Sequence, residues 1–190
     1  MRLYLASRSE SRRRLLMGAG FDVVVVEPEY EEPPPFLPAS CYVVEMAQQK
    51  ANSVVRKVSQ MKGRIILAAD TVVECNGELL GKPRDVEEAR TILRRCSGRE
   101  QRVLTGVCVM DVEKGSHLSG FEAAVVQMKV LSEVDIEKII KEGRSLGKAG
   151  AYAIREDSPD EFVELLQGSH DTIIGLPLGL VKGLLSQLGV

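Results

Sequence analysis

Runs of apolar residues with two different periods alternate along this chain. Short apolar runs rich in β-branched residues predict strands at residues 2–6, 23–26, 65–75, 103–112, 118–131 and 162–166. Apolar positions with helical spacing, bounded by capping and breaking residues, predict helices at residues 9–19, 39–58, 85–96, 132–143 and 175–188. We expect residues 23–26 to form a buried strand. These elements follow no strict βαβ rhythm, so the pattern predicts a mixed α/β fold with antiparallel strand pairs.

Local signals mark where several of these elements begin or end. Ser9 can cap the first helix, and Ser132 can cap the fourth. Asp85 followed by Glu88 is a capping pair at the start of the third helix. The Asn76-Gly77 pair is typical of a tight hairpin turn.

The segment EPEYEEPPPFLP, residues 27–38, interrupts this regular pattern. Its prolines exclude a helix or a central strand, because proline lacks the amide hydrogen that both structures need. Two interpretations stay open from the residues alone. The segment is either a solvated linker or a functional loop over a binding site.

Length and charge limit the classes of function. The chain has 190 residues, enough for one domain with a proper core, and we expect a single domain over residues 1–190. The net charge is −2 and aromatic residues make up 4% of the chain. A basic stripe and stacking platforms are therefore both missing, which argues against an RNA- or tRNA-binding module and against nucleic acid as a partner. Any anion site must be a local concentration of Lys and Arg.

Cysteine, histidine and apolar runs indicate the compartment. The four cysteines show no C-x-x-C pairing, and the two histidines are far apart, so we expect reduced thiols and no zinc site. His170 has no partner cysteine or serine in a known catalytic pattern. No apolar run approaches a membrane span, and the first residues lack the apolar core of a signal peptide. We expect a cytoplasmic protein with no membrane partner.

The first predicted helix has positive charges at its start, where the helix dipole favours negative ones. Arg8, Arg12, Arg13 and Arg14 surround its start, where the helix dipole disfavours each cation by about 0.3–1 kcal/mol. A bound anion would reverse the sign of these terms, and free N–H groups at the helix start would help to hold it. The alternative is a solvated basic face. On the anion interpretation, removing Arg12 should leave the ligand-free fold as stable as before or more so.

Carboxylates and lysines suited to phosphate chemistry lie further along the chain. Asp70 ends an apolar strand, where a carboxylate either caps a turn or meets a cation or metal. A second carboxylate could come from the acidic segment, and spacing does not decide among Glu27, Glu29, Glu31 and Glu32. Lys82, in Gly-Lys-Pro, and Lys50, after an apolar helical face, are either ligand-binding or solvated. The absence of a G-x-x-x-x-G-K-[ST] motif excludes a P-loop enzyme.

Eight segments, taken in order, resemble the Maf family over nearly the whole chain. They are LASRSESRRRLL, AQQKA, AADTVV, LLGKP, CSGR, LTGV, GKAGAYAI and GLPL. The resemblance implies hydrolysis of the α–β phosphate bond of a nucleoside triphosphate with a divalent metal, Mg or Mn. It also implies an elongated, two-lobed mixed α/β fold with a central cleft, related to the inosine triphosphate pyrophosphatases, and a homodimer.

The same resemblance implies roles for individual carboxylates. Asp70, in AADT, matches the carboxylate treated as the proton acceptor. Glu31 best matches the carboxylate of the acidic loop, and the adjacent Glu32 is the second choice. Asp70 and Glu31 are thus the expected metal ligands, and the expected substrate is a nucleoside triphosphate.

The basic residues follow the same pattern. Ser9 and Arg12, with Arg13 beside them, match the start of a phosphate-binding helix. Lys50 and Lys82 match the two lysines of the cleft. In the resulting hypothesis these cations hold the phosphates, while Asp70 or the metal activates the attacking water.

The choice of base rests on three positions. Thr71, directly after Asp70, marks the branch that acts on dTTP and UTP, whereas a branch that acts on methylated GTP carries Gln there. Ser11 and Arg155, both associated with base choice, depart from the family pattern. Two alternatives therefore remain: the same reaction on methylated GTP, or a nucleotide-binding regulator of cell division and septum formation with little turnover.

Overall fold

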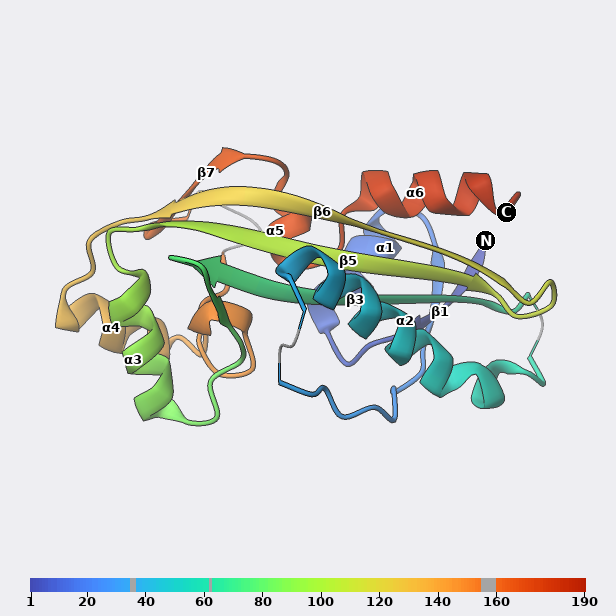
Figure 1. Ribbon diagram of the computed structural model, residues 1–190, viewed down its shortest axis with the longest axis horizontal. Coiled ribbons are helices and arrows are strands. Elements are labelled where there is room, and N and C mark those ends of the chain that lie inside the picture. Colours follow the sequence, from blue (N-terminus) through green and yellow to red (C-terminus); the bar gives the residue numbers. More distant parts are fainter. Residues whose placement is uncertain (35–36, 62, 155–159) are drawn as a thin grey trace. The chain divides into compact units, whose positions relative to one another are not determined.

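The computed structural model describes residues 1–190 except 35–36, 62 and 155–159. It has a mixed α/β architecture (Figure 1). The strands are β1 (Arg2–Ala6), β2 (Asp22–Val25), β3 (Ile65–Cys75), β4 (Glu78–Leu80), β5 (Glu100–Asp111), β6 (Ser116–Met128) and β7 (Val163–Gln167). The α-helices are α1 (Glu10–Gly18), α2 (Ala39–Val58), α3 (Val86–Cys96), α4 (Glu133–Lys141), α5 (His170–Ile174) and α6 (Leu178–Gln187), with a 3-10 turn η1 at Ala149–Ala151.

The described strands form one mixed sheet in the order β2-β1-β3-β5-β6-β7, with β4 paired to β3. Strand β1 runs parallel to both β2 and β3, so that Leu5 lies opposite Val25 on one side and Leu67 on the other. The β3–β4 and β6–β7 pairs are antiparallel. The expected mixture of strand directions is thus confirmed.

The chain divides into two compact units built from separate stretches of sequence. The first contains residues 1–70, 105–122 and 175–190, and the second contains residues 71–104 and 123–174. Strands β3, β5 and β6 each contribute residues to both units. Among the described helices, none is both long and apolar enough to cross a membrane.

Strand alternation gives the first unit two cores. Because successive strand residues point to opposite faces, Leu3 and Leu5 of β1 face one layer while Tyr4 and Ala6 face the other. Leu3 and Leu5 pack with Leu16 of α1 and with residues of α6. Tyr4 and Ala6 pack instead with the apolar face of α2. Helix α2 therefore covers one face of the strands, and α1 and α6 cover the other.

A close approach of backbone to backbone joins α2 to β5 in the same unit. A methyl group added at Gly106 would lie 2.3 Å from the carbonyl oxygen of Val43 and 2.7 Å from the amide nitrogen of Val44. These atoms belong to the helix backbone and cannot rotate away. Glycine at this position thus sets how near the first turns of α2 can lie to the sheet.

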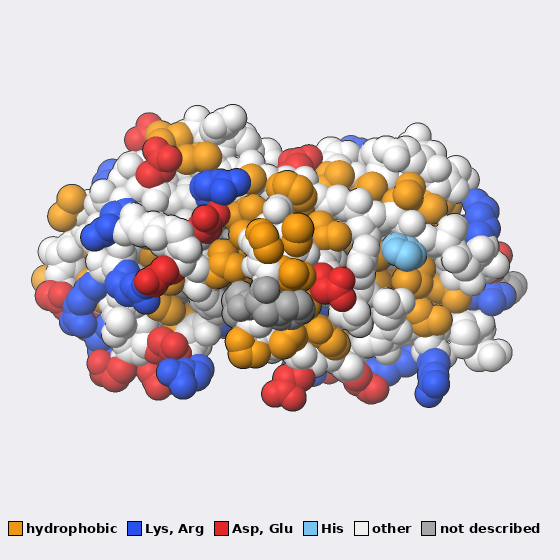
Figure 2. Space-filling model, viewed as in Figure 1, with side chains coloured by type: hydrophobic (Ala, Val, Ile, Leu, Met, Phe, Trp, Pro, Cys, Tyr) orange, Lys and Arg blue, Asp and Glu red, His pale blue; other side chains and the backbone are white. Residues whose placement is uncertain are grey.

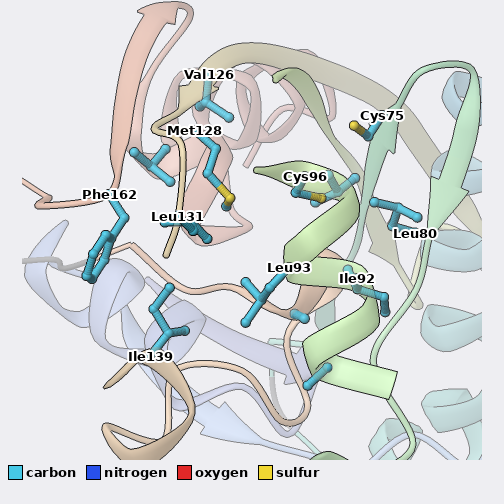
Figure 3. Close-up of a cluster of buried hydrophobic side chains, with 14 of the residues drawn as sticks. Cys75, Leu80, Ile92, Leu93, Cys96, Val126, Met128, Leu131, Ile139 and Phe162 are labelled. Carbon is cyan, nitrogen blue, oxygen red and sulfur yellow. The ribbon is translucent and has the colours of Figure 1, made fainter. Parts of the chain in front are cut away.

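The second unit has a core of its own, drawn in Figure 3. Leu93 and Cys96 of α3 are fully buried in it, with Met128 of β6 and Ile139 of α4. The capping box predicted at the start of α4 is present, since Ser132 and Asp135 exchange hydrogen bonds. The shared core packs α3 and α4 together with β6.

Charged pairs cover the outside of this unit. Arg90 contacts Glu137 at 2.6 Å, and Arg94 contacts Glu133 at 2.7 Å, so two ion pairs join α3 to α4. On the face of the molecule in Figure 2, acidic and basic side chains are interspersed. Such exposed pairs add little stability individually.

Most predicted elements are confirmed, and the exceptions have physical reasons. Residues 39–58 form α2 as predicted, and Asn76-Gly77 makes the β3–β4 turn with positive φ at both residues. The buried strand expected at 23–26 is wrong: β2 is the terminal strand of the sheet, and Val25 is 43% exposed. The closing helix begins at Leu178, because Pro177 occupies its N-cap, and a short helix, α5, precedes it unpredicted.

The contact at Gly106 yields the first prediction. Gly106→Ala should lower the free energy of unfolding by about 2–3 kcal/mol, because the new methyl group overlaps fixed backbone atoms. Urea unfolding of both proteins measures this change. Gly18→Ala in α1 is the control, since no atom lies within 4 Å of its added methyl group, and its stability should be unchanged or higher by about 0.5 kcal/mol. Equal stability of the two variants would contradict this description of the α2–β5 contact.

Candidate active site

The turn between β1 and α1 is built from serine side chains. The Ser9 hydroxyl accepts a hydrogen bond from the amide of Arg12 at 3.4 Å, which confirms Ser9 as the helix N-cap. The Ser9 amide in turn donates to the buried Ser7 hydroxyl at 3.1 Å. Sequence reasoning missed Ser7, although a serine two residues before a cap is a common partner in such turns.

Arg12 uses its side chain to join three segments of the first unit. Its guanidinium donates to the carbonyl oxygen of Gly175 at 2.7 Å, to that of Ala69 at 2.9 Å and to the Ser7 hydroxyl at 3.3 Å. Burial lowers the pKa of Arg12, and the negative charges of Asp70 and Glu32 oppose that shift. An arginine remains protonated under such conditions. Arg12 therefore brings a partly buried positive charge near Asp70.

This arrangement counts against one expectation from the sequence. On the anion interpretation of the basic helix start, removal of Arg12 would leave the ligand-free fold unharmed. The structure shows it bonded to two backbone carbonyl oxygens from distant parts of the chain. The reason lies in the fold, since the first turn of α1 lies beside Ala69, in the middle of β3, and beside the segment that leads into α6.

The neighbouring arginines differ from Arg12. Arg13 pairs with Glu10 at 3.0 Å, one turn back on the exposed side of α1. Arg8 is exposed and lies 3.4 Å from Glu27. Acidic neighbours thus offset part of the positive charge that the sequence places at this helix start.

Asp70 and Lys50 meet because of two periodicities. Asp70 lies in the middle of β3 and not at a strand end as predicted, because β3 continues to Cys75. Ile66, Ala68 and Asp70 alternate along β3 and therefore share the face that packs on α2. Lys50 lies on the buried stripe of α2, between Ala47 and Val54. The Lys50 ammonium donates to Asp70 Oδ1 at 2.6 Å, and both side chains are more than nine-tenths buried. A solvated position for Lys50 is thereby excluded.

Residues 27–33, called here the acidic loop, run back along α2 and contact it at three positions. Lys57 donates to the Glu27 carbonyl oxygen at 3.0 Å and pairs with the Glu29 carboxylate at 2.7 Å. Two turns earlier on the helix, Lys50 pairs with Glu32. Two turns earlier again, the Tyr42 hydroxyl donates to the Pro33 carbonyl oxygen at 2.8 Å. The loop is therefore a structured part of the site rather than a free linker.

Glu32, and not Glu31, reaches the buried lysine. Glu32 Oε1 lies 2.6 Å from Lys50 Nζ, and its side chain is 32% exposed. Glu31 and Glu32 are both exposed as whole residues, so the contact with Lys50 is what distinguishes them. Spacing in the sequence could not tell which one would make this contact.

The charges of this site act on Tyr42, another residue that sequence reasoning missed. Burial raises the pKa of Tyr42 to about 12, and the negative charges of Asp70 and Glu32 add to the increase. Tyr42 therefore stays a neutral hydrogen-bond donor at physiological pH. Its bond to Pro33 holds the residue that follows Glu32.

One atom of this cluster lacks a partner within the described part of the chain. Asp70 Oδ2 is buried and accepts no hydrogen bond there. A buried carboxylate oxygen without a donor is costly and marks a place where a cation or a proton donor is expected. Within the same described ranges, no group of three or more His, Cys, Asp or Glu side chains could hold a metal ion. Two carboxylates completed by phosphate oxygens are, however, a common set of ligands for Mg²⁺.

Comparison with known proteins places this geometry in a family. Residues 2–188 match the family of Maf-like proteins. The chain belongs to the Maf family. One relative, a dTTP/UTP pyrophosphatase of Anaeromyxobacter dehalogenans, is 41% identical, and the match covers 99% of this chain and 94% of the relative. Proteins of the same name from Clostridium botulinum (strain Hall) and Caldanaerobacter subterraneus are 34% and 35% identical, with matches that cover 99% and 98% of this chain and 97% and 89% of those relatives.

Several Maf segments meet within the first unit. Arg12, from the first segment, binds the carbonyl oxygens of Ala69, in AADT, and of Gly175, in GLPL. Ser11 lies half-buried on α1 beside this contact. Ser9, Arg12, Lys50 and Asp70, all singled out from the sequence, are therefore parts of this unit.

The remaining Maf residues belong to the second unit or lie outside the described residues. Lys82 is exposed there, next to the buried Pro83. The Gly81 carbonyl oxygen accepts a hydrogen bond from the Gly150 amide at 3.1 Å, which joins LLGKP to GKAGAYAI. Thr71 follows Asp70 on β3 and points to the opposite face. Arg155 lies outside the described residues, and the roles expected for these residues stay predictions.

The contrast between two adjacent arginines yields the second prediction. Arg12→Ala should lower the free energy of unfolding of the nucleotide-free protein by about 2 kcal/mol, because two backbone carbonyl oxygens lose their donor. Arg13→Ala removes only an exposed pair with Glu10 and should change it by less than about 0.5 kcal/mol. Chemical denaturation without nucleotide measures both. If Arg12→Ala proves as stable as Arg13→Ala, the bracing role is wrong.

Proposed function

We propose that this Maf protein hydrolyses nucleoside triphosphates, dTTP and UTP in particular, to nucleoside monophosphate and pyrophosphate with the help of a divalent metal ion. Full-length relatives that carry the name dTTP/UTP pyrophosphatase support the substrate class. Thr71, after Asp70, matches the pattern of the branch that acts on pyrimidine nucleotides.

The observation that carries the proposal is the buried cluster of Asp70, Lys50 and Glu32. Binding a nucleotide needs cations alone, whereas hydrolysis also needs a group that orients or deprotonates water. Asp70 is a buried carboxylate with one oxygen held by Lys50 and the other without a partner in the described chain. Such an arrangement fixes the carboxylate in one orientation and leaves one oxygen for chemistry. A hydrolase therefore suits this site better than a regulator with little turnover.

Each residue of the cluster has a definite task in the proposed reaction. Asp70 and Glu32 would hold Mg²⁺ or Mn²⁺, which supplies charge neutralisation and acidifies bound water. The Asp70 carboxylate also orients the attacking water and accepts its proton. Lys50 donates to phosphate oxygens as negative charge develops on the leaving pyrophosphate.

Arg12 supports this chemistry from the other side of β3. It holds the Ala69 carbonyl oxygen and so fixes the backbone that carries Asp70. Glu32 replaces Glu31 in the proposal, because the structure brings Glu32 to Lys50. Lys82, Arg13 and Ser9 remain proposed phosphate ligands on the resemblance to the Maf family.

We propose that the protein acts in the cytoplasm, which its four free cysteines favour. We also propose a homodimer, on the resemblance to the Maf family.

Product analysis tests the proposed reaction. Incubation with Mg²⁺ and dTTP or UTP should yield monophosphate and pyrophosphate in equal amounts, with turnover abolished by a chelator. Chromatography that shows diphosphate and free phosphate would refute the reaction. A parallel series with methylated GTP tests the alternative branch.

Variants of carboxylates test the assignment of the residues. Asp70→Asn and Glu32→Gln should each lower turnover by at least about a hundredfold, because each removes a proposed metal ligand and Asp70→Asn also removes the proton acceptor. Glu31→Gln is the matched control for Glu32. Asp111→Asn is the control for Asp70, since Asp111 is also buried but bonds to the amides of Glu113 and Lys114. Both controls should keep most of the activity, and an active Asp70→Asn variant would exclude Asp70 from the mechanism.

A further inference from the structure

We propose that Lys50 is a built-in substitute for the metal ion: in the nucleotide-free protein its ammonium neutralises Asp70 and Glu32, and an arriving divalent cation displaces it toward the phosphates. The inference rests on the proposed metal dependence and adds an exchange of cations at that site.

Geometry supplies the first argument. Lys50 Nζ lies 2.6 Å from Asp70 Oδ1 and 2.6 Å from Glu32 Oε1, so one ammonium bridges two carboxylates that come from a strand and from a loop. A bridging position between two carboxylates is also where a divalent cation binds. The lysine thus occupies the charge position that a bound metal would take.

Electrostatic repulsion prevents the metal ion and the Lys50 ammonium from binding these carboxylates at the same time. A metal held at about 2.1 Å by either of these oxygens would lie within about 5 Å of the ammonium at its present position. A divalent cation and an ammonium at that separation repel each other strongly in a buried site. Binding of the metal to these oxygens therefore requires Lys50 to withdraw.

Burial explains why a substitute is needed at all. Asp70 is 2% exposed, and a second carboxylate lies beside it. Without Lys50 the two neighbouring carboxylates would repel each other, and the positive charge of Arg12 would offset only part of that repulsion. A lysine suits the exchange, since its ammonium is a compact charge on a flexible four-carbon stem. The backbone of α2 need not move when the ammonium does.

The exchange would couple metal binding to phosphate binding. An ammonium released from the carboxylates becomes a hydrogen-bond donor for phosphate oxygens at the moment when the metal arrives with its nucleotide. The unpartnered Asp70 Oδ2 gives the incoming metal a first ligand before Lys50 leaves. Metal alone should therefore bind weakly to the wild-type protein, because it must compete with a cation that is already present.

Replacement of the lysine tests this competition without any turnover. Lys50→Met keeps the length of the side chain and removes its charge. Calorimetric titration of nucleotide-free protein with Mn²⁺ should show binding at least about tenfold tighter in Lys50→Met than in the wild type. Lys138→Met is the control, since Lys138 lies on α4 in the second unit and forms an exposed pair with Glu161, and the affinity of this variant for Mn²⁺ should equal that of the wild type. Unchanged or weaker binding in Lys50→Met would overturn the proposal.

A second variant shows where the metal binds. In Lys50→Met/Asp70→Asn, the gain in Mn²⁺ affinity should disappear. Persistence of the gain would place the metal elsewhere and would also overturn the proposal.

Chemical labelling of the wild-type protein serves if Lys50→Met does not fold. Amine acylation followed by mass spectrometry should modify Lys50 slowly in the metal-free protein and faster when Mn²⁺ is added, while Lys138 reacts equally in both. Unchanged or slower modification of Lys50 would contradict the exchange. Hydrolysis is measured separately, so an active enzyme whose Lys50 ignores Mn²⁺ refutes the exchange alone, whereas inactivity toward every triphosphate refutes the proposed function.

Discussion

The contact between Asp70 and Lys50 is the constraint on which the site depends. A strand that is apolar on both faces carries a carboxylate in its middle, and a helix that is apolar on its buried face carries one ammonium. Removing one partner of such a buried pair leaves an uncompensated charge and is strongly destabilising. The pair thus ties the register of α2 to that of β3. It also places the Asp70 carboxylate where water has little access.

Contacts from the acidic loop on one side and from Arg12 on the other hold this pair in place. The acidic loop is fastened along α2 at Lys57, Lys50 and Tyr42, and the second of these contacts delivers Glu32. Arg12 fastens the opposite side through the carbonyl oxygens of Ala69 and Gly175. Two cations and two carboxylates result, so the nucleotide-free cluster is close to neutral. A site with balanced charge can hold its shape and still exchange one cation for another.

Sequence patterns predicted the secondary structure well because the signals were local. The cap at Ser9, the turn at Asn76-Gly77 and the amphipathic helix over 39–58 each depend on residues a few positions apart. The prediction of a buried strand at 23–26 was wrong, because β-branching indicates a strand but does not reveal whether another strand lies beyond it.

The chemistry of the site was predicted in its residue types more than in its contacts. Asp70 and Lys50 stood out as a carboxylate at a strand end and a lysine beside an apolar helical face. The choice between Glu31 and Glu32 depended on which of them contacts Lys50. The bracing role of Arg12 depended on carbonyl oxygens 57 and 163 residues away in the sequence. No local pattern records contacts of that range.

The most direct test of the account is to locate a bound metal by anomalous X-ray scattering. Crystals grown with Mn²⁺ and a non-hydrolysable analogue of dTTP would show the ion as a single strong peak. The account predicts Mn²⁺ in direct coordination with the carboxylates of Asp70 and Glu32 and with phosphate oxygens, and the Lys50 ammonium on the phosphates. An ion bound away from Asp70, with Lys50 still bridging both carboxylates, would contradict it.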